Sequence, residues 1–218
     1  NAAAVPVIAG RKSDAEKFAG ADITYTLEPL MGDRRALQFC TSHNLGANFA
    51  KGFGIQYLDT NNQLQYVWQT SWGLSTRVVG GIIMVHGDDK GLIMPPRLAP
   101  TQIVIVPIFK TDAERAPVLA AAQKLRDALG EKFRVELDAR DGLTPGFKFN
   151  DWEMRGVPLR VELGPKDLEK QQVVVARRDT GAKEFIAQDA LVARVPGWLD
   201  AVHAEIFARA KKFRDDNT

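Results

Sequence analysis

The sequence contains a single cysteine, Cys40, among its 218 residues. One thiol cannot form an intrachain disulfide, and it excludes a metal site built from several cysteines, so a reducing compartment such as the cytoplasm is expected. Long apolar runs are also missing, since residues 82–85 fall far short of the roughly 20 that a membrane span requires. No charged and then apolar leader opens the chain. We therefore expect a cytoplasmic protein without a membrane partner and without a bound metal.

An excess of one charge is also lacking. The chain has 29 Lys and Arg against 27 Asp and Glu, a net charge of +2, which neither requires nor excludes a polyanionic partner. The chain opens on Asn1 and not on an initiator Met, and we interpret the chain as a fragment that begins at an internal position. Its length suits two modest domains, each with its own core.

The most informative stretch is residues 65–100. Residues 66–72 alternate bulky and polar side chains and predict a half-buried strand, whereas the apolar residues of 76–86 recur at helical spacing. Ser75, Thr76 and Arg77 therefore lie at a helix N-terminus, where free backbone N–H groups favour anions. From the residues alone, the favoured alternative for Arg77 is an ion pair within the fold.

The first hundred residues predict an antiparallel sheet with helices. Strands are expected at 5–8, 23–30, 36–41, 55–58 and 64–72, and helices at 13–18 and 44–53. The hairpin of 23–41 would present Gln38, Thr41, Ser42 and His43 at its end. His43 could also be an ordinary histidine whose hydrogen bonds are satisfied at a strand terminus.

After residue 101 strands alternate with helices. Strands are expected at 103–108, 133–137, 158–163, 173–176 and 184–186. Thr111 and Glu114 form a capping box, Thr144 and Pro145 start a helix that runs to 155, and a last helix covers 196–214. This pattern predicts a five-stranded mixed sheet covered on both faces. No glycine-rich phosphate loop follows its first strand, so nucleotide binding by this part is disfavoured.

Several longer motifs resemble a known family. The segments TSWG, LSTR, HGDDKGL and PPRLAP are similar to the third signature motif of class II aminoacyl-tRNA synthetases, in the form found in archaeal and eukaryotic-type prolyl-tRNA synthetases. The resemblance extends upstream through GRKSDAEKFAGADITYTLE and LQFCTSHNLGANFAKGF, and downstream through DGLTPGFKFNDWEMRGVPLRVELGPKDLE. It covers residues 5–218.

The resemblance implies an α/β (α+β) fold: part of a class II catalytic domain in residues 1–100 and an anticodon-binding domain in 101–218. It implies ligation of L-proline to its tRNA through a prolyl-adenylate, with ATP and Mg²⁺ as a substrate complex, by a homodimer. Motifs one and two would precede residue 5, so the fragment alone should be inactive. The alternative is a non-catalytic RNA-binding or regulatory paralogue.

The resemblance also implies roles for single residues. Arg77 corresponds to the motif-three arginine that lies against adenine, and it is the residue we expect to act in catalysis. Further ATP-binding residues would be Gln38, Thr41 and Ser75, and proline-binding residues Phe18, His43 and Trp72. Trp72 at a strand end could instead be a core residue.

Anticodon-binding residues would be Arg140, Phe147, Lys148 and Glu153, since single-stranded bases are read by stacking and by edge hydrogen bonds. The alternative for this set is a solvated charged face. Relatives usually carry small residues where this chain has Phe39 and Cys40, which either point into the core or reshape the site.

Overall fold

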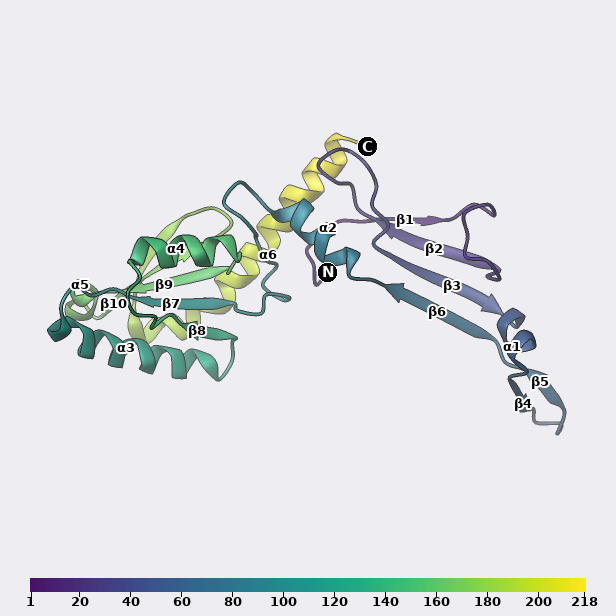
Figure 1. The fold of residues 1–218 in the computed structure, drawn as a ribbon, viewed down its shortest axis with the longest axis horizontal. Helices are drawn as coiled ribbons and strands as arrows, with labels where there is room; N and C mark the ends of the chain where they lie inside the picture. The colour runs from purple at the N-terminus through teal and green to yellow at the C-terminus, as the bar shows by residue number, and fades with distance from the viewer. The chain divides into compact units, whose positions relative to one another are not determined.

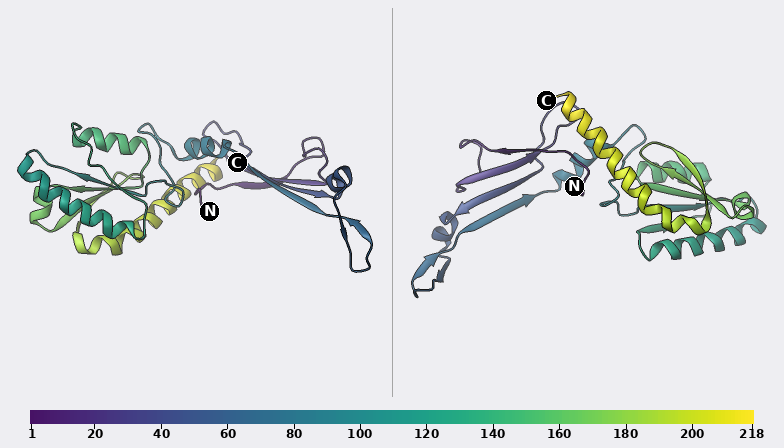
Figure 2. Two further views of the ribbon diagram at one scale, coloured as in Figure 1. Left: turned by 60° about the horizontal axis from the view of Figure 1, so that its bottom comes forward. Right: turned by 180° about the vertical axis from the view of Figure 1, so that it is seen from behind.

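The computed structural model describes residues 1–218, which fold into two compact units (Figures 1 and 2). The N-terminal unit consists of residues 6–85 with 216–218, and the C-terminal unit of residues 86–215 with 1–5. None of the helices is both long and apolar enough to span a membrane.

The N-terminal unit is built on a four-stranded sheet in the order β1-β2-β3-β6. All three pairings are antiparallel, as expected. The strands are β1 (Ile8–Arg11), β2 (Ile23–Glu28), β3 (Cys40–Gly46) and β6 (Gln69–Leu74). A short helix α1 (Asn48–Phe53) and a two-stranded hairpin of β4 (Gln56–Leu58) and β5 (Leu64–Tyr66) connect β3 to β6. Helix α2 (Arg77–His86) follows β6 after two residues, so the predicted passage from strand into helix is confirmed.

Several boundaries predicted in this unit were wrong. The strand expected at 5–8 begins only at Ile8, and the strand expected at 64–72 is divided into β5 and β6. Residues 13–18 form turns instead of a helix: the Ser13 hydroxyl bonds to the Glu16 carboxylate, whereas in a capping box each side chain bonds to a backbone N–H. The strand expected at 36–41 begins only at Cys40, because residues 31–37 form a loop closed by backbone bonds such as Met31 N to Arg35 O. Residues 44–46 extend β3 instead of opening a helix, since sheet pairing overrides their helical pattern.

The register of this sheet decides which side chains share a face. Thr24 lies opposite His43, Thr26 opposite Thr41, and Thr41 opposite Gly73. Because neighbours in a strand point to opposite faces, the residues between them form the other face. Tyr25, Leu27, Cys40, Trp72 and Leu74 lie there, and the large ones among them are exposed.

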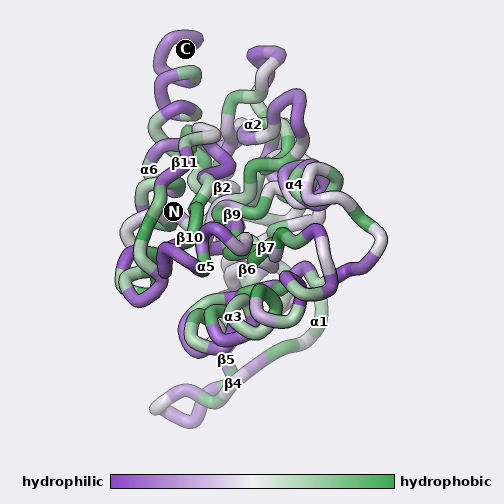
Figure 3. Tube along the Cα trace, turned by 90° about the vertical axis from the view of Figure 1, so that its left-hand side faces the viewer, coloured by the Kyte–Doolittle hydropathy of each residue, from purple (hydrophilic) through white to green (hydrophobic).

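The C-terminal unit contains the predicted five-stranded mixed sheet, in the order β11-β10-β9-β7-β8. Strand β7 (Ile103–Pro107) pairs in parallel with β8 (Val135–Leu137) and β9 (Leu159–Leu163). Strands β10 (Gln172–Arg177) and β11 (Lys183–Ala187) are added antiparallel at the β9 edge. All five residues of β7 are buried, and this strand is one of the hydrophobic stretches of Figure 3.

Helices cover both faces of this sheet, as predicted. One face packs against α3 (Asp112–Gly130) and α6 (Leu191–Asp216) in the main core, which includes Ile105, Leu129, Val161 and Val202. The other face packs against α4 (Pro145–Met154), where Val104 and Val106 contact Phe149 and Trp152. A short α5 (Pro165–Glu169), which we did not predict, follows β9.

The N-termini of the helices show which of the predicted capping residues form caps in the structure. Thr111 forms the expected reciprocal capping box with Glu114, and Thr144 accepts a hydrogen bond from Phe147 N at the start of α4. The last helix starts at Leu191, after a 3₁₀ turn η1 (Gln188–Ala190), and not at Pro196 as predicted. Leu191 and Val195 are fully buried, so packing of the additional turn outweighs the unfavourable proline within the helix.

Residues 86–99 pack within the C-terminal unit. Leu92 N donates to Met154 O and Met94 N to Gly156 O, which pairs this segment with the end of α4. Gly91 has a φ of +124°, and a Cβ there would lie 2.5 Å from Met154 Cα. The compact units therefore divide between residues 85 and 86, whereas the domain boundary at 100/101 stays a prediction.

Candidate functional site

His43 is held by two hydroxyl groups on one face of the N-terminal sheet. Its Nδ1 lies 2.9 Å from Thr24 Oγ1 and its Nε2 lies 3.0 Å from Thr41 Oγ1. The ring of Phe18 is tilted at 43° to the imidazole, with 5.0 Å between the ring centres. The structure thus brings Phe18, Thr41 and His43 together, and it adds the buried Thr24, which the sequence reasoning missed. The sequence signal for Thr24 is the alternation of residues 23–28, which places alternate side chains of this strand on one face of the sheet.

Arg77 lies beside Gln38 at the start of α2. Its Nη1 donates to the carbonyl oxygen of Gln38 at 3.5 Å, a long hydrogen bond, and its backbone N donates to Ser75 Oγ at 3.3 Å. The Gln38 side chain accepts a 2.6 Å hydrogen bond from Lys12 Nζ. Three of the predicted nucleotide ligands are therefore neighbours, and Lys12 adds a second cation, which was not among the residues predicted from the sequence.

Trp72 lies apart from the other two predicted proline ligands. It pairs with Ser42, whereas His43 pairs with Ser71, so the indole and the imidazole belong to opposite faces of the sheet. Trp72 is 81% exposed, so within this chain it is not a core residue. It lines an apolar cleft of about 480 Å³ with Tyr25, Leu27 and Leu74.

Phe39 and Cys40, the two departures from the family pattern, separate in the structure. Phe39 is 9% exposed and packs under α2 next to Gly81. Cys40 is half-buried and lines the cleft that contains Trp72, on the face opposite His43. Both side chains therefore lie away from the imidazole of His43.

In the C-terminal unit, Asp138 is the centre of a polar network at the start of α4. Its carboxylate accepts hydrogen bonds from Arg140 at 2.7 and 2.8 Å and from Trp152 Nε1 at 2.8 Å. Burial alone would raise the pKa of Asp138, but the hydrogen bonds from Arg140 and Trp152 lower it to about 2. Arg140 also bonds Asp151 at 2.8 Å, so its guanidinium is committed to two carboxylates, which raise its pKa further.

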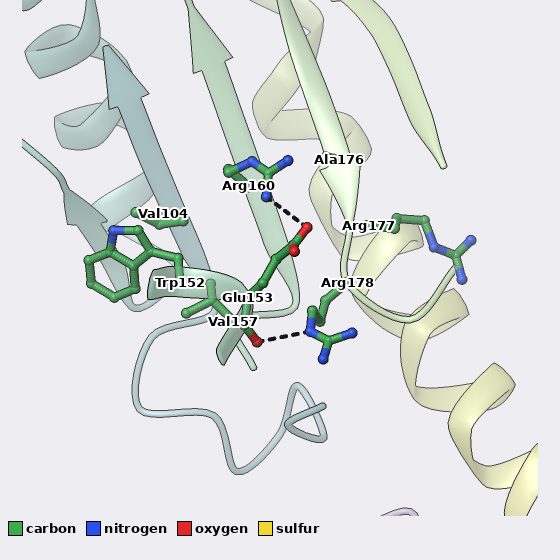
Figure 4. A pocket seen from close by; sticks show the side chains of 8 residues that line it. All are labelled: Val104, Trp152, Glu153, Val157, Arg160, Ala176, Arg177 and Arg178. Atoms are coloured by element: carbon green, nitrogen blue, oxygen red, sulfur yellow. Dashed lines mark hydrogen bonds and ion pairs between the residues drawn. The ribbon is translucent and has the colours of Figure 1, made fainter. Parts of the chain in front are cut away.

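The remaining predicted anticodon residues have very different environments. Lys148 is 4% exposed and donates to the Asp138 carbonyl at 3.0 Å, so it is a buried residue that supports the network. Its neighbour Phe147 is 54% exposed. Glu153 accepts a hydrogen bond from Arg160 Nη1 at 3.3 Å, as Figure 4 shows.

Arg160 is the centre of a second cluster, which the sequence reasoning missed. Its guanidinium lies 4.1 Å from the centre of the Phe149 ring, and it donates to Glu162 at 3.0 and 3.1 Å. Lys183 on β11, two strands away from β9, bonds Glu162 and lies 5.8 Å from the Phe149 ring centre. The alternation Leu-Arg-Val-Glu-Leu in β9 is the sequence signal that Arg160 and Glu162 share one face.

A cation above an aromatic ring, flanked by carboxylates, combines a planar stacking group with hydrogen-bond donors and acceptors. These are the groups that recognise unstacked RNA bases. Arg160 and Glu162 are only 9% and 7% exposed, so this cluster lies beneath α4, whereas the ring of Phe147, two residues before Phe149, is 54% exposed on another side of the helix. Phe147 is therefore the stacking group of this set that is open to solvent.

Comparison with known proteins places this chain among its relatives. The family described as "Anticodon binding domain" matches residues 102–198. The chain is 53% identical to the "Proline--tRNA ligase" of Roseiflexus sp. (strain RS-1) over 218 residues, which are 99% of this chain and 45% of that protein.

Two further relatives have similar names. The chain is 54% identical to "Proline--tRNA ligase 2" of Bacillus anthracis over 215 residues, 99% of this chain and 42% of that protein. It is also 54% identical to "Proline--tRNA ligase, chloroplastic/mitochondrial" of Arabidopsis thaliana, over 98% of this chain and 41% of that protein. The chain spans less than half the length of these relatives; over that region it is similar to prolyl-tRNA synthetases, and its residues 102–198 match the anticodon-binding domain family.

Proposed function

We propose that the protein to which this chain belongs ligates L-proline to its tRNA, using Mg²⁺-bound ATP and a prolyl-adenylate intermediate. The chain would contribute part of the ATP and proline site together with the anticodon-binding domain. The observation that carries this proposal is the identity of 53% over 99% of the chain.

The N-terminal unit suits the activation step. One carboxylate oxygen of proline attacks the α-phosphorus of ATP, the bond to the β-phosphate oxygen breaks, and pyrophosphate leaves with the electron pair. No side-chain nucleophile is required, because the protein has to align two anions and neutralise charge that develops on phosphate. Arg77, with its planar guanidinium beside Gln38, would lie against adenine, and Thr41 and Ser75 would complete the nucleotide contacts.

Phe18 and His43 form the proline subsite in this proposal. The two hydroxyl contacts fix the plane of the imidazole, and the Phe18 ring provides an apolar wall 5.0 Å from it. This geometry favours a small, partly apolar substrate between the rings. Trp72 lies on the opposite face of the sheet from His43, so we assign it no direct contact with proline.

The anticodon surface in this proposal is the face of α4 and β9. Phe147 would stack on a base and Glu153 would contribute edge contacts, with the buried Arg160 orienting the Glu153 carboxylate, and Arg140 and Lys148 would hold α4 through Asp138. We further propose that the protein acts as a homodimer in the cytoplasm, and that the sequence boundary between its two domains lies at residues 100/101.

Proline-dependent exchange of pyrophosphate into ATP, followed by charging of tRNA, tests the proposal in the full-length protein. Exchange that depends on proline and not on other amino acids is the expected result. Binding of tRNA without any exchange would instead identify a non-catalytic RNA-binding paralogue, the second reading of the sequence.

A further inference from the structure

Phe39 occupies a space beside α2 that exists only because residue 81 is glycine. A Cβ added to Gly81 would lie 2.6 Å from Phe39 Cε2, closer than real Cβ atoms come, and a tight 3.2 Å from both Phe39 Cδ2 and Leu37 Cδ2. Gly81 is buried and Phe39 is 9% exposed, so the aromatic ring packs directly against the helix backbone. The adjacent Gly80 has no atom within 4 Å of the corresponding position.

Gly81 lies one helical turn after Arg77. Residues four apart lie on the same face of a helix, so the face of α2 that receives Phe39 is also the face that carries Arg77. Phe39 in turn directly follows Gln38, whose carbonyl oxygen accepts the Arg77 hydrogen bond at 3.5 Å. The Phe39 ring and the Arg77 guanidinium therefore both connect residues 38–39 to helix α2, at adjacent positions.

We propose that Phe39, packed into the gap at Gly81, is a positioning residue that sets the distance of Arg77 from Gln38 and so the geometry of the nucleotide subsite. This inference rests on the proposed function for the role of Arg77. Its physical basis is the close packing of a buried ring against helix backbone: the enclosed ring has little free space to turn into, so added volume there is expected to displace α2.

A pair of adjacent substitutions tests this inference in the full-length protein. Gly81→Ala and Gly80→Ala add the same methyl group to the same helix and raise its intrinsic propensity equally, but only the first meets the Phe39 ring. We expect Gly81→Ala to raise the KM for ATP or lower kcat by about ten- to a hundredfold, because small displacements at a reacting centre have effects of that size. Gly80→Ala should stay within about twofold of wild type. Equal effects of the two substitutions would overturn the inference.

Two further variants separate positioning from a general loss of structure. Phe39→Leu removes the ε atoms that the new methyl group would meet, so Phe39→Leu/Gly81→Ala should recover most of the ATP kinetics lost in Gly81→Ala. If Gly81→Ala does not fold, Phe39→Leu alone should still raise the KM for ATP while the KM for proline changes by less than about twofold. No recovery in the double variant, or parallel changes in both KM values, would contradict the inference.

A double-mutant cycle with Arg77 distinguishes failure of this inference from failure of the proposed function. If the contact acts through Arg77, Gly81→Ala should cause little further loss of exchange in an Arg77→Ala background. Additive losses would mean that Phe39 does not act through Arg77. An Arg77→Ala variant with wild-type exchange would instead refute the assignment of Arg77 itself.

Discussion

Arg178 and Asp88 form a two-pronged ion pair across 90 residues of sequence, with Nη2 to Oδ1 at 2.6 Å and Nη1 to Oδ2 at 2.9 Å. The Arg178 side chain is only 4% exposed, and its Nε donates to the carbonyl oxygen of Glu153 at 2.9 Å, as Figure 4 shows. One guanidinium thus joins the segment after α2 to the end of α4. The Arg178 hydrogen bond is the main cause that lowers the pKa of Asp88 to about 2.

Asp88→Asn should destabilise the C-terminal unit by about 2 kcal/mol at pH 7, because it leaves a buried guanidinium without its carboxylate. Urea denaturation of the 218-residue chain measures the loss. Since the folded pKa of Asp88 is below its ordinary value of 3.8, the stabilisation is present above pH 3.8 and is lost as the pH falls towards 2. The difference between variant and wild type should therefore shrink in that window. Asp89→Asn, at the exposed neighbour, is the matched control, and an equal loss there would contradict the prediction.

His86 predicts a second pH dependence, near neutrality. The ring is fully buried, its Nε2 donates to the Ala3 carbonyl oxygen at 2.9 Å, and burial lowers its pKa from the ordinary 6.5. Below pH 6.5 the unfolded chain binds a proton that the folded chain excludes, so stability should fall as the pH decreases from 7 to 5. His203, whose pKa burial also lowers, acts in the same direction. His86→Gln should reduce the slope of unfolding free energy against pH, and an unchanged slope would assign the effect to other groups.

Arg77→Ala in the full-length protein should lower ATP–pyrophosphate exchange and leave tRNA affinity unchanged. The proposed contact of Arg77 is with ATP, and loss of one charged donor costs about 2 to 4 kcal/mol at a transition state. Exchange kinetics and a tRNA filter-binding assay measure the two effects separately. Exchange within twofold of wild type would remove Arg77 from the site.

Lys148 and Phe147 are adjacent but should respond to substitution in different ways. Lys148→Ala should cost about 2 kcal/mol of folding stability, because it removes a buried hydrogen bond to the Asp138 carbonyl oxygen. Phe147→Ala should leave stability within about 0.5 kcal/mol, since its side chain is mostly exposed, but should raise the KM for tRNA. Thermal unfolding and aminoacylation kinetics measure the two properties. A stable Lys148→Ala variant with weak tRNA binding would restore Lys148 as a direct RNA contact.

Residues 86–100 should stabilise the isolated C-terminal unit. A chain of residues 101–218 retains the complete five-stranded sheet and is expected to fold alone. A chain of residues 86–218 also retains Ile93, which is 2% exposed and packs with Ile206, and it should be more stable by at least about 2 kcal/mol. Chemical denaturation of the two chains gives the comparison. Equal midpoints would mean that the segment contributes nothing to the stability of the unit.

The sequence by itself determined the elements whose signals are local. Thr111 and Glu114 predict the start of α3 because a capping box is complete within four residues, and the uninterrupted apolar run of β7 predicts a doubly covered strand. The motifs around TSWG and HGDDKGL likewise identified the family without reference to contacts. Each of these inferences depends on residues that are close together in the chain.

Only the tertiary structure decided what depends on register and on long-range packing. Strand alternation separates Trp72 from its neighbours, but only the pairing of His43 with Ser71 shows that the imidazole and the indole are on opposite faces. Lys148 follows Thr144 and Pro145 at a helix start, where a lysine is usually solvated, yet Asp138 draws it inside. The contacts of Phe39 with Gly81 and of Arg178 with Asp88 join residues 42 and 90 positions apart. Such pairs leave no local pattern, because chain segments distant in sequence meet only when the chain folds.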